Sequence, residues 1–323
     1  MTKFAPLARL AILDDYQGVT LDLGPWSDAP PTMAITTFRD TLKDADALVE
    51  RLAPFDAILA MRERTPFPRA LLARLPNLRL LISTAARNRS IDLEACAELG
   101  ITACGTPDAG APTVDLTWAL ILCLARDIPN QQASLRAGAW QTKVGIGLEG
   151  KTLAVLGLGK LGARVAKVGA ALGMRIIAWS PNLTEARAAE AGATRVDKAT
   201  LLAEADVLTL HVVLSERSRG IIAAADLAQM KPTAFIVNTS RGPLIDQPAL
   251  ITALTEGRIA GAGLDVFDIE PLPPGHPILA APNTVLTPHL GYVAEQNYRA
   301  YFEGAVEAIN AFEAGHPIRI MTP

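Results

Sequence analysis

Short apolar runs alternate with amphipathic segments along nearly the whole chain. The first set of runs covers Leu10–Leu13, Met33–Thr36, Ala57–Met61, Leu78–Ile82 and Ile101–Ala103. The second set covers Leu153–Leu156, Arg175–Trp179, Asp206–Val212, Ala234–Asn238, Gly263–Val266 and Val285–Thr287. Helix-like patterns lie between the runs, as at Asp92–Leu99, Lys160–Leu172 and Gln247–Glu256. This rhythm predicts an α/β fold in which parallel strands are covered by helices.

The length of the chain, 323 residues, indicates two domains, because one domain usually holds roughly 100–200 residues. A long helix is predicted over Pro112–Ala137, between the two sets of strands, and Pro129 is expected to kink or end it. A final helix is predicted over Ala294–Ala314, with the first domain as a candidate for its packing partner. We expect a first domain of residues 1–104 with 295–323, and a second domain of residues 105–294.

The composition is that of a globular protein without a general affinity for polyanions. Half of the residues are apolar and the net charge is −3, which argues against nucleic acid or an anionic membrane as a partner. Cys96, Cys104 and Cys123 form no C-x-x-C pair, so reduced thiols are expected rather than disulfides or a metal site. No secretory signal is visible, and the longest strongly apolar run, Thr117–Ala125, is shorter than the about 20 residues of a membrane span. We therefore expect a cytoplasmic protein.

A glycine-rich turn follows the first strand of the second set. The apolar run Thr152–Leu156 leads into Gly157-Leu158-Gly159-Lys160-Leu161-Gly162, and a helix follows. In a dinucleotide-binding turn, the first glycine permits the tight turn, the second lets a pyrophosphate approach the backbone, and the third lets helix and strand pack. The backbone N–H groups of Lys160 and Leu161 would point at the phosphates from the helix N-terminus. The strand before the turn and the helix after it favour a dinucleotide site over a purely structural turn.

The next strand lacks a feature that is usual for NAD. NAD sites commonly place a carboxylate at the end of this strand to bind the ribose diol. Here the strand ends in Trp179-Ser180-Pro181-Asn182, and the nearest acid, Glu185, lies too far along. Ser180 and Asn182 can hydrogen-bond either a hydroxyl or a phosphate, and no carboxylate repels a 2′-phosphate. The sequence leaves both NAD and NADP open.

Polar residues follow three later strands of the second set. These segments are Asn238-Thr239-Ser240-Arg241-Gly242, then Gly263-Leu264-Asp265-Val266-Phe267 with Glu270-Pro271, and then Thr287-Pro288-His289-Leu290-Gly291. In a doubly wound sheet, ligands bind beyond the carboxyl ends of the strands. The pattern predicts that an Arg, an Asp, a Glu and a His meet at one edge of the sheet.

With these motifs in this order and spacing, the chain resembles the D-isomer-specific 2-hydroxyacid dehydrogenases, a family that includes glyoxylate/hydroxypyruvate reductases and phosphoglycerate dehydrogenases. The resemblance implies two Rossmann-like domains: a flavodoxin-like substrate domain and a doubly wound parallel-sheet dinucleotide-binding domain. It also implies a homodimer.

The resemblance assigns catalytic roles to Arg241, Glu270 and His289. His289 would be the acid/base, because the histidine side chain gains and loses a proton near neutral pH. Glu270 would orient its ring, and Arg241 would bind the substrate carboxylate with its planar fork. Asp265 would contact the cofactor near the nicotinamide. The implied cofactor-binding residues are Gly157, Gly159, Lys160, Leu161, Gly162, Ser180, Asn182, Val212, Thr239, Arg241, Asp265, His289 and Gly291.

On the substrate side, family members bind the carboxylate through backbone N–H groups of a first-domain loop. The matching segment begins Ser83-Thr84-Ala85-Ala86, with Ala85 where the family commonly has Gly. Alanine disfavours positive φ, so the shape of this loop is open. Arg62 either faces the substrate tail or is a solvated residue of Arg62-Glu63-Arg64. The implied substrate-binding residues are Arg62, Thr84, Ala85, Ala86, Arg241 and His289.

Two functions are compatible with these residues. The first is reduction of a small 2-oxo acid, such as glyoxylate or hydroxypyruvate, to the D-2-hydroxy acid with NADH or NADPH. The second is a nucleotide-sensing, corepressor-like binding protein on the same fold. No metal is expected in either case.

Overall fold

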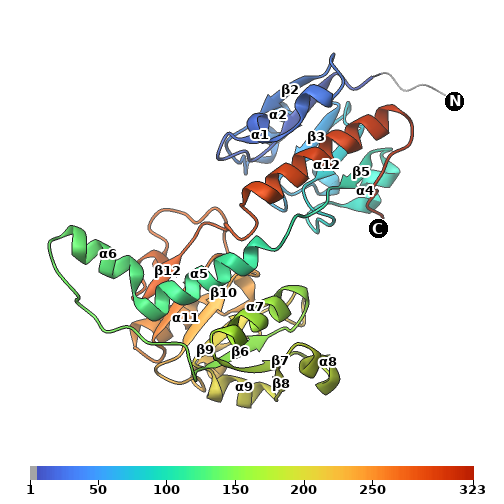
Figure 1. Cartoon of the computed structure of the whole chain (residues 1–323). Coiled ribbons are helices and arrows are strands. Elements are labelled where there is room, and N and C mark those ends of the chain that lie inside the picture. Colours follow the sequence, from blue (N-terminus) through green and yellow to red (C-terminus); the bar gives the residue numbers. More distant parts are fainter. Residues whose placement is uncertain (1–5) are drawn as a thin grey trace. The chain divides into compact units, whose positions relative to one another are not determined.

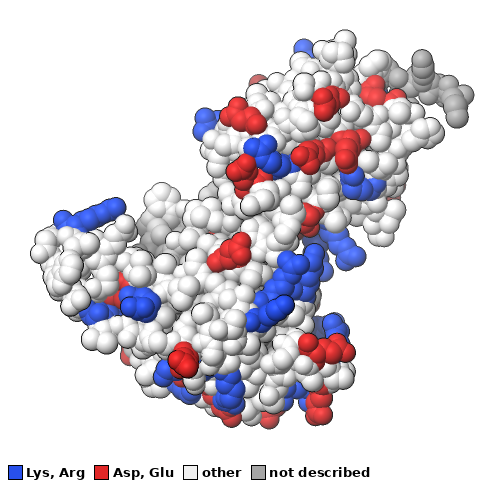
Figure 2. Space-filling model, in the orientation of Figure 1, with Lys and Arg blue, Asp and Glu red and all other residues white. Residues whose placement is uncertain are grey.

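The computed structural model describes residues 6–323, which divide into two compact units (Figure 1). The first unit holds the described residues through Gly110 together with Ala294–Pro323, and the second holds Ala111–Val293. On the face drawn in Figure 2, side chains of both charge signs occur on each unit. None of the helices formed by residues 6–323 combines the length and the apolar character that a membrane span requires.

A sheet of parallel strands in the order β2-β1-β3-β4-β5 forms the centre of the first unit. These strands are β1 (Arg9–Ile12), β2 (Ala34–Thr37), β3 (Ala57–Ala60), β4 (Leu80–Ser83) and β5 (Thr102–Gly105). The helical elements are α1 (Thr20–Leu23), η1 (Trp26–Asp28), α2 (Ala45–Leu52), α3 (Arg69–Leu72), α4 (Leu93–Glu98) and α12 (Glu295–Glu313). This strand order is that of flavodoxin-like domains. The predicted flavodoxin-like sheet is confirmed.

The central strands of the first sheet are buried on both faces. Every residue of β3 and β4 is buried, as expected for central parallel strands covered on both faces. Asp44 and Asp92 begin α2 and α4, and each carboxylate accepts a hydrogen bond from a backbone N–H of the first turn. The final helix, α12, crosses this sheet and contacts β4 and β5 (Figure 1). The segment 294–314 therefore packs on the first unit.

The second unit contains a parallel sheet in the order β12-β11-β10-β9-β6-β7-β8. Its strands are β6 (Thr152–Leu156), β7 (Arg175–Trp179), β8 (Thr194–Arg195), β9 (Val207–Leu210), β10 (Phe235–Asn238), β11 (Gly261–Leu264) and β12 (Thr284–Leu286). Its helical elements are α5 (Pro112–Arg126), α6 (Ile128–Arg136), α7 (Lys160–Ala171), α8 (Glu185–Glu190), α9 (Lys198–Glu204), α10 (Ala224–Leu227), η2 (Gly242–Leu244), α11 (Gln247–Thr255) and η3 (Pro277–Ala280). Counted from β6, the order contains the doubly wound 3-2-1-4-5-6 arrangement of dinucleotide-binding sheets. The predicted doubly wound sheet is confirmed.

Two local predictions for the second unit need correction. The single helix predicted over Pro112–Ala137 is two helices, α5 and α6, separated by Asp127 in the left-handed conformation (φ 53°). Pro129 does not end a helix but lies in the first turn of α6, where a missing N–H costs no hydrogen bond. The sheet also has the strand β8, which the sequence analysis missed because its two residues are exposed and form no apolar run.

Candidate active site

The glycine-rich turn joins β6 to α7, and two of its glycines are required by the packing of the chain itself. Gly157 has φ +99°, and a Cβ there would lie 2.7 Å from Cγ1 of Val212. A Cβ on Gly162 would lie 2.1 Å from the carbonyl oxygen of Gly157. Both distances are far below van der Waals contact, so only glycine permits this close approach of helix and strand.

Gly159 differs from the other two glycines of the turn. A Cβ at Gly159 would meet no heavy atom within 4 Å, and the residue is exposed at the N-cap of the twelve-residue helix α7. The first N–H groups of a helix have no partner within the helix, and the helix dipole favours an anion there. A pyrophosphate can approach the backbone N–H groups at the start of α7 only if the space beside Gly159 is open. The turn therefore fits a dinucleotide.

The end of β7 lies next to this turn. Leu156 pairs with Trp179 across the two strands, and the N–H of Gly157 donates to the carbonyl of Trp179. Ser180 is half-buried and Asn182 is exposed. The residues that follow β7 thus carry hydroxyl and amide groups. The first carboxylate after this strand is that of Glu185, in α8.

Arg241 lies in the loop that follows β10, and hydrogen bonds within the loop fix its conformation. The buried side chain of Asn238 accepts a hydrogen bond from the N–H of Ser240 (3.0 Å) and donates one to the carbonyl of Arg241 (2.9 Å). The guanidinium donates to the carbonyl of Ser240 at 2.8 Å. A Cβ on Gly242 would lie 2.1 Å from the carbonyl carbon of Phe267, so glycine lets this loop touch the loop that follows β11.

The side chains of His289 and Glu270 are hydrogen-bonded to each other at the same edge of the sheet. Nδ1 of His289 lies 2.6 Å from Oε2 of Glu270, and Oε1 of Glu270 accepts a hydrogen bond from the N–H of Phe267 at 3.0 Å. Because Phe267 also touches Gly242, a continuous series of contacts joins the Arg241 loop to the imidazole. The backbone of His289 is left-handed (φ 56°), a conformation rare for residues other than glycine.

Asp265 holds the loop that carries His289. Its carboxylate is fully buried. Oδ1 accepts from the Thr287 hydroxyl (2.6 Å) and the Leu290 N–H (2.7 Å), and Oδ2 accepts from the Gly291 N–H (2.8 Å). The pKa of Asp265 is raised, because the effect of burial exceeds the lowering by these hydrogen bonds and by the nearby His289. The Asp265 carboxylate therefore binds the His289 loop on both sides of the histidine, at Thr287 before it and at Leu290 and Gly291 after it.

In the first unit, the residues predicted to bind substrate surround the ends of β3 and β4. Arg62 has φ 54° and Ala85 has φ 68°, so Ala85 adopts the conformation for which glycine is usual. The N–H of Ala85 donates to the Thr106 hydroxyl at 2.8 Å, whereas Ala86 is exposed. Thr84 is fully buried, and its hydroxyl accepts from the N–H of Arg62 at 2.8 Å and donates to the sulfur of Met61.

The sequence and the fold match known proteins. Residues 118–291 match the family model described as "D-isomer specific 2-hydroxyacid dehydrogenase, NAD binding domain". A glyoxylate reductase of Aeropyrum pernix is 39% identical over 76% of this chain and 76% of its own length. A glyoxylate reductase of Korarchaeum cryptofilum is 36% identical over 98% of this chain and 92% of its own.

This chain belongs to the D-isomer-specific 2-hydroxyacid dehydrogenase family. A D-3-phosphoglycerate dehydrogenase of Methanocaldococcus jannaschii is 40% identical over 79% of the chain but over only 49% of its own length. The crystal structure of a phosphoglycerate oxidoreductase from Vibrio cholerae has a TM-score of 0.91 and 38% identity, and the match covers 96% of this chain and all of that one.

Membership of the family makes this dehydrogenase an oxidoreductase that acts on CH–OH groups and uses NAD(P). The two-domain fold predicted from the resemblance is confirmed. The alternative interpretation, a nucleotide-sensing binding protein of the corepressor type, receives no support from these relatives.

Several supporting residues of the dehydrogenase site were missed in the sequence. Thr113 and Thr117 of α5 link two strand-end loops: the Thr113 hydroxyl donates to the carbonyl of Gly291 (2.7 Å), and the Thr117 hydroxyl donates to the carbonyl of Thr113 (2.7 Å). Thr239 lies 2.9 Å from Thr117, and because the Thr117 proton is already donated, the Thr239 hydroxyl is the donor in this contact. Two threonines four positions apart at a helix start were the available signal.

Proposed function

We propose that this dehydrogenase reduces a small 2-oxo acid, such as glyoxylate or hydroxypyruvate, to the D-2-hydroxy acid. One observation carries the proposal: the His289–Glu270 pair, at 2.6 Å, lies at the same strand edge as Arg241 and the glycine-rich turn. The relatives named glyoxylate reductase support the substrate class.

His289 is the proton donor in this proposal. Because Nδ1 faces Glu270, Nε2 is the ring nitrogen that would give a proton to the carbonyl oxygen of the substrate. The carboxylate of Glu270 fixes the orientation of the ring by its hydrogen bond to Nδ1. Asp265 assists by holding the backbone at Leu290 and Gly291.

Arg241 would bind the substrate carboxylate and the neighbouring carbonyl oxygen. Two parallel N–H donors of a guanidinium match a carboxylate, and its permanent charge stabilises negative charge that develops on the carbonyl oxygen. The reduced nicotinamide supplies the hydride for the carbonyl carbon. The Asn238 side chain and Gly242 orient Arg241 through the backbone contacts of its loop.

Cofactor and substrate contacts are proposed as predicted from the sequence. The cofactor would lie along the glycine-rich turn, Ser180, Asn182, Val212, Thr239 and Gly291, with Asp265 acting through the loop that it holds. Because Thr239 already donates its proton to Thr117, its hydroxyl would offer an acceptor to the cofactor. The first domain, residues 1–104 with 295–323, would bind substrate through Arg62 and Ala86. Thr84 and Ala85, whose hydroxyl and N–H are already engaged within the chain, would act by shaping this loop. Residues 105–294 would form the dinucleotide-binding domain.

We also propose a cytoplasmic homodimer. Large apolar side chains are exposed along α5, α6 and the segment after them: Leu122, Ile128, Leu135, Trp140 (76% exposed) and Val144 (93% exposed). Exposed apolar side chains in one region are typical of a subunit interface. The three cysteines are free thiols, which fits a reducing compartment. Burial raises the pKa of Cys96 and Cys104 to about 11, which makes these thiols unreactive.

A spectrophotometric screen tests the proposed reaction. Purified protein with NADH or NADPH should oxidise the cofactor when glyoxylate or hydroxypyruvate is added, and the two cofactors should be compared because β7 ends without a carboxylate. Cofactor binding without turnover across a broad panel of 2-oxo acids would contradict the reductase and favour a nucleotide-binding role.

A further inference from the structure

The backbone of Arg62 is held in its left-handed conformation by side chains from the next strand. The N–H of Arg62 donates to the hydroxyl of Thr84 at 2.8 Å, and the carbonyl of Arg62 accepts from the amide of Asn88 at 2.6 Å. Residues other than glycine rarely adopt this conformation, and such outliers cluster at ligand sites. Two side-chain hydrogen bonds therefore stabilise this backbone conformation of Arg62 at the end of β3.

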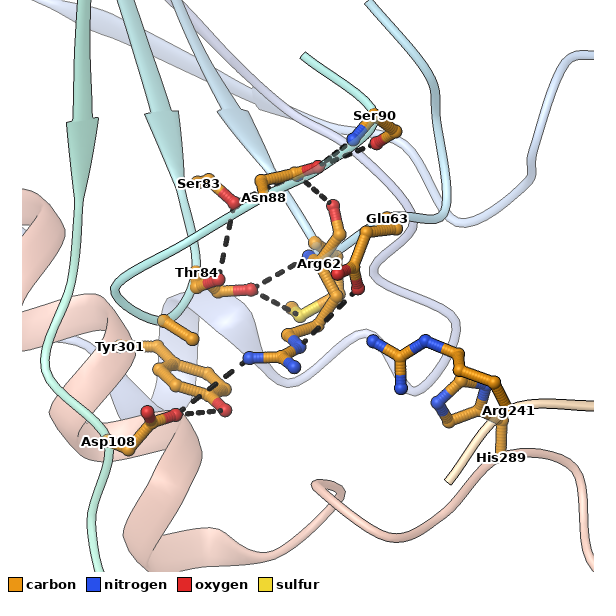
Figure 3. A network of polar contacts seen from close by, with 12 residues as sticks. Arg62, Glu63, Ser83, Thr84, Asn88, Ser90, Asp108, Arg241, His289 and Tyr301 are labelled. Carbon is orange, nitrogen blue, oxygen red and sulfur yellow. Dashed lines mark hydrogen bonds and ion pairs between the residues drawn. The ribbon is translucent and has the colours of Figure 1, made fainter. Parts of the chain in front are cut away.

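The residues that hold Arg62 are themselves buried and fully engaged. Thr84 is 0% and Asn88 is 5% exposed. The Asn88 amide also donates to the Ser83 hydroxyl at 3.0 Å, and its oxygen accepts from the N–H (2.8 Å) and the hydroxyl (2.6 Å) of Ser90. Figure 3 shows this network beside and above the Arg62 side chain. These hydrogen bonds fix the backbone from which the Arg62 side chain extends.

Two carboxylates flank the guanidinium of Arg62 (Figure 3). Nη1 lies 3.9 Å from Oδ1 of Asp108, and Nε lies 3.9 Å from Oε2 of Glu63. A buried tyrosine positions Asp108: the hydroxyl of Tyr301, which is 1% exposed, donates a hydrogen bond to Oδ1 of Asp108 at 3.1 Å. Arg62, Glu63 and Asp108 together carry a net charge of −1, so the guanidinium does not form a positive pocket.

Arg64, Arg87 and Arg89 of the first unit have different surroundings from those of Arg62. Arg64 interacts electrostatically with the buried Asp14, whose pKa it helps to lower against the larger, raising effect of burial. Arg87 and Arg89 are exposed and line a groove with the C-terminal residues 320–323. Arg62, by contrast, pairs with Glu63 and Asp108.

We propose that Glu63 and Asp108 make Arg62 select a neutral substrate tail, one that ends in hydrogen or a hydroxyl, against a phosphate or a second carboxylate. This inference rests on the proposed 2-oxo acid reduction. A hydroxyl accepts a hydrogen bond from the guanidinium and donates one to a flanking carboxylate, so it uses both kinds of group. A dianionic phosphate at the same place lies against two negative charges, which opposes its binding.

Kinetics with hydroxypyruvate and 3-phosphohydroxypyruvate test the selection. In the wild type, kcat/KM should favour hydroxypyruvate. Asp108→Asn and Glu63→Gln, made separately, should each raise the ratio of phosphorylated to unphosphorylated efficiency by about tenfold, because each removes one repelling charge without a change of shape. The matched control Asp46→Asn removes an arginine-paired carboxylate of α2 in the same unit and should leave the ratio unchanged.

The possible outcomes separate this inference from the proposed function. A wild type that reduces neither substrate nor glyoxylate with either cofactor contradicts both. A wild type that reduces glyoxylate, combined with an unchanged ratio in both variants, overturns only the selection, as does an equal loss of efficiency for both substrates. Two independent variants keep the test decisive if one of them fails to fold, which thermal unfolding reveals.

Discussion

The strand ends of the two sheets are built from different kinds of turn. In the first unit, Asp14 (φ 58°), Arg62 (φ 54°) and Ala85 (φ 68°) follow β1, β3 and β4, and none of them is glycine. In the second unit, Gly157 (φ 99°) follows β6, and His289 (φ 56°) is the left-handed non-glycine residue after β12. A left-handed backbone costs a residue with a Cβ roughly 1–2 kcal/mol.

Buried hydrogen-bonding side chains compensate for this cost in the first unit. Asp14 accepts hydrogen bonds from the hydroxyls of Thr41 and Thr65, and Thr106 accepts one from the N–H of Ala85. The glycine-rich turn of the second unit uses close backbone packing instead. The difference suits the proposed roles, because a small substrate needs fixed side-chain directions whereas a pyrophosphate needs an accessible backbone.

The largest expected effect concerns the strained residue of the second unit. His289→Gln should lower kcat by about 1,000-fold, because it removes the proton donor. Cofactor affinity, measured by fluorescence titration, should change little. His316→Gln, at an exposed position, is the matched control. Unchanged turnover in His289→Gln would refute the acid/base assignment.

Arg241→Lys should lower kcat/KM by about 100-fold although the charge is kept, because an ammonium cannot form the two parallel hydrogen bonds of a guanidinium. Steady-state kinetics with glyoxylate measure the effect. The control Arg258→Lys alters an exposed arginine that pairs with Glu256 and should behave as the wild type. Equal efficiency of Arg241→Lys and the control would argue against carboxylate binding by Arg241.

Substitutions at two glycines of the glycine-rich turn should affect different properties, the stability of the fold at Gly162 and the binding of the cofactor at Gly159. Gly162→Ala should lower the free energy of unfolding by about 2 kcal/mol or more, because its Cβ overlaps the Gly157 carbonyl. Gly159→Ala should leave stability nearly unchanged but weaken cofactor binding by about tenfold, because its methyl group fills the space for the pyrophosphate. Urea unfolding and cofactor titration measure the two effects. The reverse pattern would contradict the proposed cofactor position.

His211 should make the stability of the second unit sensitive to acid. Burial lowers the pKa of His211 to about 4, whereas an unfolded histidine has a pKa of about 6.5. Between these values the unfolded chain binds the proton more strongly, so stability falls as the pH falls from about 6.5 to 4 and is complete above that range. Relative to pH 7, the loss at pH 5 should be about 2 kcal/mol. His211→Gln should remove this loss in urea unfolding, and identical pH profiles would contradict it.

The smallest expected effect concerns the support of Ala85 in the first unit. Thr106→Val removes the acceptor of the Ala85 N–H and should cost about 1 kcal/mol of stability. Thr102→Val, on the neighbouring β5, is the matched control and should cost less, because valine suits a strand. Equal stability of the two variants in urea unfolding would show that Thr106 does not sustain the left-handed turn.

Most of the fold could be predicted because its signals are local. Apolar runs identified ten of the strands within about two residues at each end, and β7 was predicted with its observed bounds. The exposed, two-residue β8 has no such signal. The break at Asp127 was also missed, because a left-handed aspartate between two helices has no sequence signature as strong as that of Pro129 two residues later.

The sequence alone determined the alternation of strands and helices and the glycine-rich motif at 157, 159 and 162, since periodicity and a motif of this kind can be recognised in a short stretch of chain. Only the tertiary structure decided which polar groups meet. Asp108 and Tyr301 are separated by 193 positions, and Asp265 reaches the loop around His289 from 22 to 26 positions away. Such partners come together only after strand order and packing bring distant segments side by side. For this reason the candidate acid/base histidine could be named from its motif, whereas the contact of Arg62 with Asp108 could not.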